Sequence, residues 1–226
     1  MQKILLILIA LLVLGACKFN RPTEMDEGVI HYKIEYPQEV QEKGFADFLP
    51  SKMITTFKDK NYKVTIKGDL SLYNLEYISK ANGDSATTLF RIFDKRMFHP
   101  HDKGEHLFLF QKVDETKVEY ITEEIRDIAG FQCKKAIVHF QDSDLPSITV
   151  FYTEEIKFNR PKENSPFDDI PGALMEFQII FKDLTLKCTA HKVDIKHVND
   201  KAFDIPNNYT QTERGEIDEL VATLIQ

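Results

Sequence analysis

The sequence lacks a hydrophobic run long enough to cross a membrane as a helix. Its longest apolar run, residues 4–14, follows the short basic start Met1-Gln2-Lys3, whereas a membrane-spanning helix needs about 20 apolar residues. A short apolar run behind a basic start is typical of a cleaved export signal. We therefore expect residues 1–16 to be a signal peptide and not a permanent anchor.

Cysteine is scarce, with three residues in 226, and the first of them follows the signal directly. Leu14-Gly15-Ala16-Cys17 has the pattern of a bacterial lipobox, in which two small residues precede a cysteine that carries diacylglycerol. This pattern predicts lipidation at Cys17 and attachment to a membrane, because each buried methylene of an acyl chain contributes about 0.8 kcal/mol. The polar stretch that follows predicts a tether over residues 17–27 and a single domain over residues 28–226.

The two other cysteines, Cys133 and Cys188, allow two interpretations. An exported protein meets an oxidising compartment, which favours a disulfide between them. Free cysteine also packs as a small apolar residue, so that two separately buried thiols fit as well. A metal site at Cys188 and His191 is not expected, because a closed zinc site needs four ligands and these two face opposite sides of a strand.

A surplus of basic charge is also missing. The formal net charge is −7, and removal of the signal peptide takes away only the positive charge of Lys3. An acidic chain without a basic stripe excludes nucleic acid as an expected partner. Lys and Arg are scattered along the chain, so the sequence indicates no patch for anionic lipid headgroups either.

The sequence contains no motif for a common enzyme class. It has no Gly-x-Ser-x-Gly elbow, no glycine-rich phosphate loop and no dinucleotide fingerprint. Carboxylate pairs such as Glu123-Glu124 are adjacent in sequence, and neighbours in a strand point to opposite faces. We expect neither an enzyme nor a cofactor.

The most suggestive polar group lies in one short stretch, which contains His99, His101, Asp102, Glu105 and His106. On a strand the first two histidines face the same side, and the third can return opposite them after a turn. Three imidazoles are enough to hold zinc with one open position. Pro100 equally fits a solvated turn that has collected polar residues. We favour the turn, so no metal is expected.

Segments in which apolar and polar residues alternate run through the rest of the chain. Ile30, Tyr32 and Ile34, for example, alternate with polar residues. Period two is the signature of a half-buried strand, and short connections favour an antiparallel meander. The expected strands are 29–36, 61–68, 70–79, 86–98, 107–113, 118–128, 131–140, 147–153, 174–182 and 185–195.

Few helices are expected beside this large, curved sheet. Residues 45–49 fit a short helix. At the end of the chain Ile217, Leu220, Val221, Leu224 and Ile225 follow the spacing of an amphipathic helix, which we expect to dock on the sheet. Residues 158–169, rich in proline and charge, predict a long loop inside the domain.

Three patterns, in order, resemble the GLPGLI family of exported bacterial proteins, known mostly from Bacteroidota. They are Gly28-Val29-Ile30-His31-Tyr32-Lys33-Ile34, Ile128-Ala129-Gly130-Phe131-Gln132-Cys133-Lys134-Lys135-Ala136 and Asp169-Ile170-Pro171-Gly172-Ala173-Leu174-Met175-Glu176. The third corresponds to the motif that names the family, with Asp169 in place of its first glycine. The resemblance implies a mainly β fold like that of LolA and LolB, in which a curved antiparallel sheet forms a half-barrel with helices at its open side. It brings no catalytic residues.

The leading interpretation is a lipid-anchored binding or carrier module for a hydrophobic ligand or a partner's hydrophobic segment. The expected helices are too few to cover a large concave apolar face, and soluble monomers rarely leave such a face exposed. The alternative is a structural or assembly lipoprotein whose core is filled by its own side chains and whose outer surface carries the function. Either protein belongs in the cell envelope, at the outer membrane facing the periplasm. The expected cavity lining is Ile30, Tyr32, Ile34, Val64, Ile66, Phe108, Phe110, Val150, Phe177 and Ile179.

Overall fold

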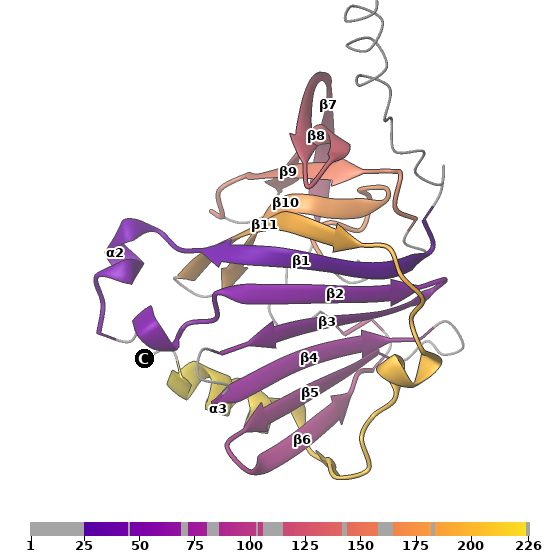
Figure 1. The fold of residues 1–226 in the computed structure, drawn as a ribbon. Helices are drawn as coiled ribbons and strands as arrows, with labels where there is room; N and C mark the ends of the chain where they lie inside the picture. Colours follow the sequence, from indigo (N-terminus) through magenta and orange to yellow (C-terminus); the bar gives the residue numbers. More distant parts are fainter. Residues whose placement is uncertain are drawn as a thin grey trace, which may run out of the picture.

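The computed structural model describes residues 25–44, 46–68, 72–80, 86–102, 104–105, 115–141, 144–157, 165–181 and 184–224. These residues form one open, curved sheet of twelve strands with a few short helices (Figure 1). The fold is mainly β and the sheet is curved and almost wholly antiparallel, as the sequence predicts. The expected signal peptide, Cys17 and the expected strand 107–113 lie outside the described residues.

Two antiparallel meanders make up the sheet. The first contains β1 (Glu27–Glu35), β2 (Lys52–Lys58), β3 (Asn61–Lys67), β4 (Tyr73–Ser79), β5 (Ala86–Ile92) and β6 (Lys95–Pro100). The second contains β7 (Thr116–Ile128), β8 (Phe131–Phe140), β9 (Ile148–Thr153), β10 (Ala173–Phe181) and β11 (Leu184–Asp194). They join in the middle, where β1 pairs with β11. The short strand β12 (Thr210–Gln211) runs parallel to β6 and forms one edge, and β7 forms the other.

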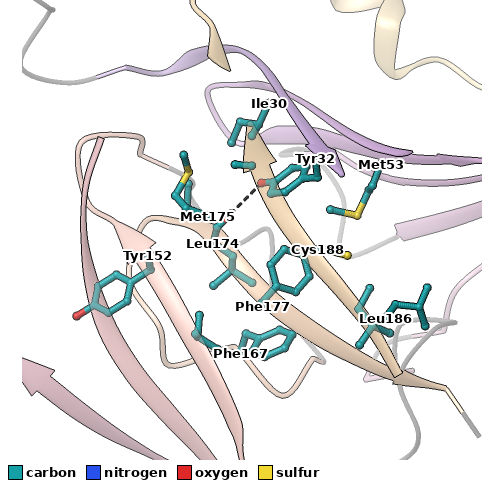
Figure 2. Packing of buried hydrophobic residues seen from close by; sticks show 14 of the residues in the cluster. Ile30, Tyr32, Met53, Tyr152, Phe167, Leu174, Met175, Phe177, Leu186 and Cys188 are labelled. Carbon is teal, nitrogen blue, oxygen red and sulfur yellow. Dashed lines mark hydrogen bonds between the residues drawn. The ribbon is translucent and has the colours of Figure 1, made fainter. Parts of the chain in front are cut away.

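Alternation gives the sheet an inner and an outer face. On the inner face, directly opposed residues of β1 to β6 form a buried row made of Tyr32, Met53, Ile66, Leu75, Phe90 and Met97. The second meander adds side chains such as Phe177 and Leu186 to the same cluster (Figure 2). This inner face is therefore the main core of the domain.

The end of the chain covers both faces. Residues 195–209, which we call the outer strap, cross the outer face and include the 3₁₀ helix η3 (Asp200–Phe203). Val198 and Phe203 of the strap pack on Ile78 and Leu89 in a second, smaller core. The helix α3 (Arg214–Leu224) then lies behind the sheet in Figure 1 and buries Ile217 in the main core. This confirms the expected terminal helix and its docking. The side chain of Leu224 and all of Ile225 lie outside the described residues.

One strand prediction is wrong, and one strand is missing from the predictions. Residues 86–98 are not one strand but β5 and β6, which a tight turn at Phe93 and Asp94 connects. The strand β2 was not predicted, because Thr55 faces the core and Ile54 faces outward, which weakens the alternation. The short helix expected over residues 45–49 is the 3₁₀ helix η1 (Ala46–Phe48), and an unexpected single turn, α2 (Gln38–Gln41), precedes it.

The expected tether ends too late. Met25 is buried and bonds through its backbone to Glu155 and Lys157, beside Ile156. The strand β1 begins at Glu27. The last residues of the range 17–27 therefore belong to the folded domain. No helix among the described residues has the length and apolar character that a membrane span requires.

Candidate functional site

The residues expected to line a cavity do come together. Ile30, Tyr32 and Ile34 of β1 lie in the main core, and Val64 packs against it; Ile66, Val150, Phe177 and Ile179 belong to the same core. Phe108 and Phe110 lie outside the described residues. The sequence thus identifies one connected apolar set on the inner face.

Large side chains pack against one another in this set (Figure 2). The rings of Tyr32 and Phe177 meet edge to face with centroids 5.8 Å apart, and the ring of Phe167 lies 5.6 Å from that of Phe177. The hydroxyl of Tyr32 donates a hydrogen bond of 2.9 Å to the carbonyl of Leu174, and burial raises the pKa of this phenol. Phe167 comes from the segment expected to be a loop, yet it is buried in the core.

A small apolar cavity remains where α3 meets the sheet. Its volume is about 50 Å³, whereas pockets for drug-sized ligands usually measure about 300–1,000 Å³. Of the expected lining residues, Ile66 borders this cavity. Its lining is completed by Leu49, Pro50, Tyr73, Leu75, Phe90, Phe181, Leu184, Leu186 and Val221. A space of this size holds a methyl group or two, not an acyl chain.

Cys133 and Cys188 are both buried, free thiols. Cys133 lies in β8 and Cys188 in β11, so that β9 and β10 separate them. Three strand spacings amount to roughly 14 Å along the sheet, and a disulfide needs Cα atoms within about 7 Å. In the structure the second interpretation, two separately buried thiols, therefore applies. Burial raises the pKa of each thiol to about 12.

Glu105 is the centre of the polar group that the sequence singled out. Its carboxylate lies 3.1 Å from His99 Nε2 and 2.8 Å from Arg214 Nη1, and it accepts the backbone N–H of Asp102 at 3.0 Å. Burial raises the pKa of Glu105, but these hydrogen bonds outweigh it and hold the pKa at about 2. Arg214 begins α3, so the ionised Glu105 fastens the helix to the end of β6.

His101 occupies the buried side of the same group. Its ring lies 5.5 Å from that of His99, which confirms that the two share a face. His101 Nε2 and Thr88 Oγ1 are 2.7 Å apart, and the buried Nδ1 has no hydrogen-bond partner among the described residues. Burial lowers the pKa of His101 to about 4, so the ring is neutral near pH 7. The interpretation as a solvated turn is therefore wrong for this residue.

The chemistry open to this polar group is limited. Thr88 is 2% exposed, so its hydroxyl cannot meet a substrate as a nucleophile. His101 also has no carboxylate on Nδ1 to orient it, as a hydrolase triad requires. Within the described part of the chain no three His, Cys, Asp or Glu residues are arranged to hold a metal ion, and His106 lies outside that part. We interpret the group as a clasp between β6 and α3. Sequence reasoning found Glu105 but missed Arg214 and Thr88, whose contacts depend on the fold.

The residues behind the family resemblance have structural roles. Ala129 and Gly130 have φ of 52° and 81°, as a two-residue hairpin turn between β7 and β8 requires. Gly172 has φ of 64°, and a Cβ there would lie 2.0 Å from the carbonyl oxygen of Thr153. Ile170 is buried in the main core. These positions build turns and close contacts, and none of them forms a reactive group.

The sequence matches no model of a known protein family, and no characterised protein matches it either.

Proposed function

We propose that this protein is a lipid-anchored lipoprotein of the cell envelope that acts as a non-enzymatic binding module through the outer surface of its sheet. The observation that carries the proposal is the packing of the inner face, where large side chains of the described residues contact one another and border a cavity of about 50 Å³. This arrangement favours the self-filled core, the second of the two interpretations that the sequence leaves open.

The proposed anchor fits the start of the domain. Met25 is fixed in the core, and the chain between Cys17 and Met25 can span at most about 29 Å when fully extended. A lipid on Cys17 would therefore hold the domain close to the bilayer. The lipobox and the resemblance to the GLPGLI family support the outer membrane, facing the periplasm, as the location. The LolA/LolB-like half-barrel is the fold to which we would assign the open curved sheet.

The anchor is tested by changing Cys17 to Ala. The variant should fold as the wild type does but leave the membrane fraction, whereas the wild type should stay there after a high-salt wash. A variant that remains membrane-bound after the same wash would contradict the lipid anchor.

A carrier of a small apolar group is the second candidate, and the apolar lining of the cavity beneath α3 favours it. A longer ligand would require α3 to move away from Ile66 and Leu75. The discriminating experiment is titration with a fluorescent fatty acid. If the outer surface carries the function, we expect the folded wild type to show no saturable binding of the fatty acid.

A variant pair makes this test specific. Val221→Phe fills the cavity, and Leu220→Phe changes the neighbouring residue of the same helix, which does not line it. The carrier function would be supported, and the surface proposal contradicted, if the wild type binds the fatty acid saturably, Val221→Phe abolishes this binding and Leu220→Phe preserves it.

A further inference from the structure

The register of the sheet aligns one residue from each of six strands on the outer face, and five of the six are basic. Each is directly opposite the next on the neighbouring strand. The members of this basic row are, from β1 to β6, Lys33, Lys52, Lys67, Asn74, Arg91 and Arg96. Opposed residues of antiparallel strands share a face, and the five strand spacings span about 24 Å. Five of the six positions are cationic in a chain whose formal net charge is −7.

This arrangement opposes the stability of the sheet. Lys52 stands between Lys33 and Lys67, and Arg91 stands opposite Arg96. Like charges directly opposite on neighbouring strands repel each other. Lys33, Lys52, Lys67 and Arg96 make no ion pair with any described residue, and the three lysines are exposed. Four cations that repel one another across the sheet and have no ion pair among the described residues favour an anionic partner outside the chain.

Nearby lysines outside the row, namely Lys63, Lys187 and Lys192, already pair with acidic residues, so the charge that remains for a partner follows a line and not a broad patch. The neighbouring outward row contains His31, Ile54, Thr65, Glu76, Leu89 and Phe98, and no lysine or arginine. Leu89 lies beneath the outer strap, and Phe98 packs against the same small core. Glu76 accepts a hydrogen bond of 2.9 Å from Asn74 Nδ2, and its carboxylate lies 3.9 Å from Lys63 Nζ. A planar anionic membrane needs charges spread over two dimensions, whereas an extended chain can follow a single row.

An exposed aromatic residue lies at the end of the row. Phe93, in the turn between β5 and β6, is 65% exposed, and its carbonyl accepts a hydrogen bond from Arg91 Nη1 at 3.4 Å. Its φ of 48° is a left-handed conformation that is costly for a bulky residue. Glycine would suit this turn better, so the aromatic ring is present at the expense of local stability. Flat aromatic rings stack on the C–H faces of sugars.

We propose that the basic row, together with Phe93, binds an extended acidic polysaccharide that carries a carboxylate on each sugar. Successive sugars of such a chain advance by about one strand spacing, so that successive carboxylates meet successive cations. This inference rests on the proposed function, because it names the partner of the outer surface. The line of charge distinguishes this partner from a lipid surface, and the aromatic ring fits sugars better than headgroups.

The test uses the mature protein extracted from its membrane in mild detergent. Polygalacturonate oligomers of three, six and nine sugars are titrated at two salt concentrations. We expect binding that strengthens up to about six sugars, because the row spans six strands, and that weakens with salt. A neutral glucan hexamer should not bind.

The variants are matched in charge. Lys52→Gln with Lys67→Gln removes two charges from the row, and we expect at least a tenfold loss of affinity for the hexamer. Lys80→Gln with Lys134→Gln removes the same net charge from lysines that already pair with Asp204 and Glu154. This control should bind within twofold of the wild type. Phe93→Gly should bind the hexamer more weakly than the wild type, although glycine relieves the backbone strain in the turn.

The outcomes separate the two proposals. An equal loss of hexamer affinity in both double variants would contradict the polysaccharide proposal. Binding to phosphatidylglycerol vesicles or to single-stranded DNA that is as tight as binding to the hexamer would contradict it as well. If the hexamer does not bind, yet Lys52→Gln with Lys67→Gln removes a protein that co-purifies with the wild type, the polysaccharide fails and the surface proposal stands. Fatty-acid binding that Val221→Phe abolishes would instead overturn the surface proposal itself.

Discussion

Leu89 and Phe90 are consecutive residues of β5, both fully buried, and they pack in different cores. Phe90 faces the main core and α3, whereas Leu89 faces the outer strap. A residue pair of this kind occurs only where a sheet is covered on both sides. The end of the chain provides both covers, because it crosses the outer face and then returns on the inner face.

Removal of a strap contact should therefore destabilise the protein. Phe203 is 1% exposed in the small outer core, and Phe203→Ala should lower the free energy of unfolding by about 3–5 kcal/mol. Ile205→Ala, at a strap residue that is 36% exposed, should change it by less than about 1 kcal/mol. Urea denaturation of both variants measures this. Equal small effects would mean that the strap does not hold the fold together.

Two glycines should respond in opposite directions to the same substitution. Gly172→Ala forces a Cβ into contact with the backbone of Thr153 at a left-handed φ, and we expect a loss of roughly 2–4 kcal/mol. Gly215 in α3 has open space around it, so Gly215→Ala should stabilise the protein by about 0.5–1 kcal/mol. Thermal unfolding decides the sign of each change. A tolerated Gly172→Ala would show that the close contact between Gly172 and Thr153 does not constrain this position.

The buried thiols should make the protein less stable in alkali. Their pKa is about 12 when folded and 9.0 as the ordinary value, so the unfolded chain loses these protons first. The stability they contribute is complete below pH 9 and declines above it, by roughly 1 kcal/mol per thiol between pH 9 and pH 10. Cys188→Ala should make this decline in stability less steep.

Alkylation should find no reactive thiol at pH 8 in the native protein and should find both thiols, Cys133 and Cys188, after unfolding without reductant. Unreactive thiols after unfolding would reveal a disulfide.

The clasp should make the protein less stable in acid. Burial lowers the pKa of His101 from 6.5 to about 4, so the unfolded chain takes up this proton first as the pH falls. The contribution of His101 is present above pH 6.5 and is lost as the pH falls toward 4. Glu105, with a pKa of about 2 against 4.5, adds a second loss below pH 4.5. Unfolding of wild type and His101→Gln across pH 4–7 tests this. If the free energies of unfolding of the two proteins change in parallel with pH, the lowered pKa of His101 is contradicted.

The sequence predicts the strands whose apolar positions alternate without interruption. The alternation in β1 and β8 is clear, and the predicted bounds of β8 agree with the structure. The turn at Phe93 could not be predicted, because a bulky residue with positive φ leaves no glycine, asparagine or proline signal. Arg214 lies far along the chain from Glu105, so no local pattern indicates their contact.

Sequence reasoning missed one feature of the surface, which depends on strand register, and one feature of the core, which depends on a segment outside the strands. Lysines and arginines that are scattered along the chain form one row only when the strands β1 to β6 align. The filling of the inner face depends on Phe167, which reaches the core from a segment with the composition of a loop. Alternation identifies which side chains face inward, but it does not show how much space they leave.

The central claim, that the outer face is the working surface, is tested most directly by lysine labelling in intact envelopes. The protein in its envelope and the purified protein are treated with the same acylating reagent, and modification is quantified by mass spectrometry. Lys60 and Lys196, exposed residues outside the basic row, serve as references. We predict that Lys33, Lys52 and Lys67 are several-fold less modified in the envelope than in the purified protein, while the references are modified equally. Equal modification of all five lysines in both samples would contradict the claim.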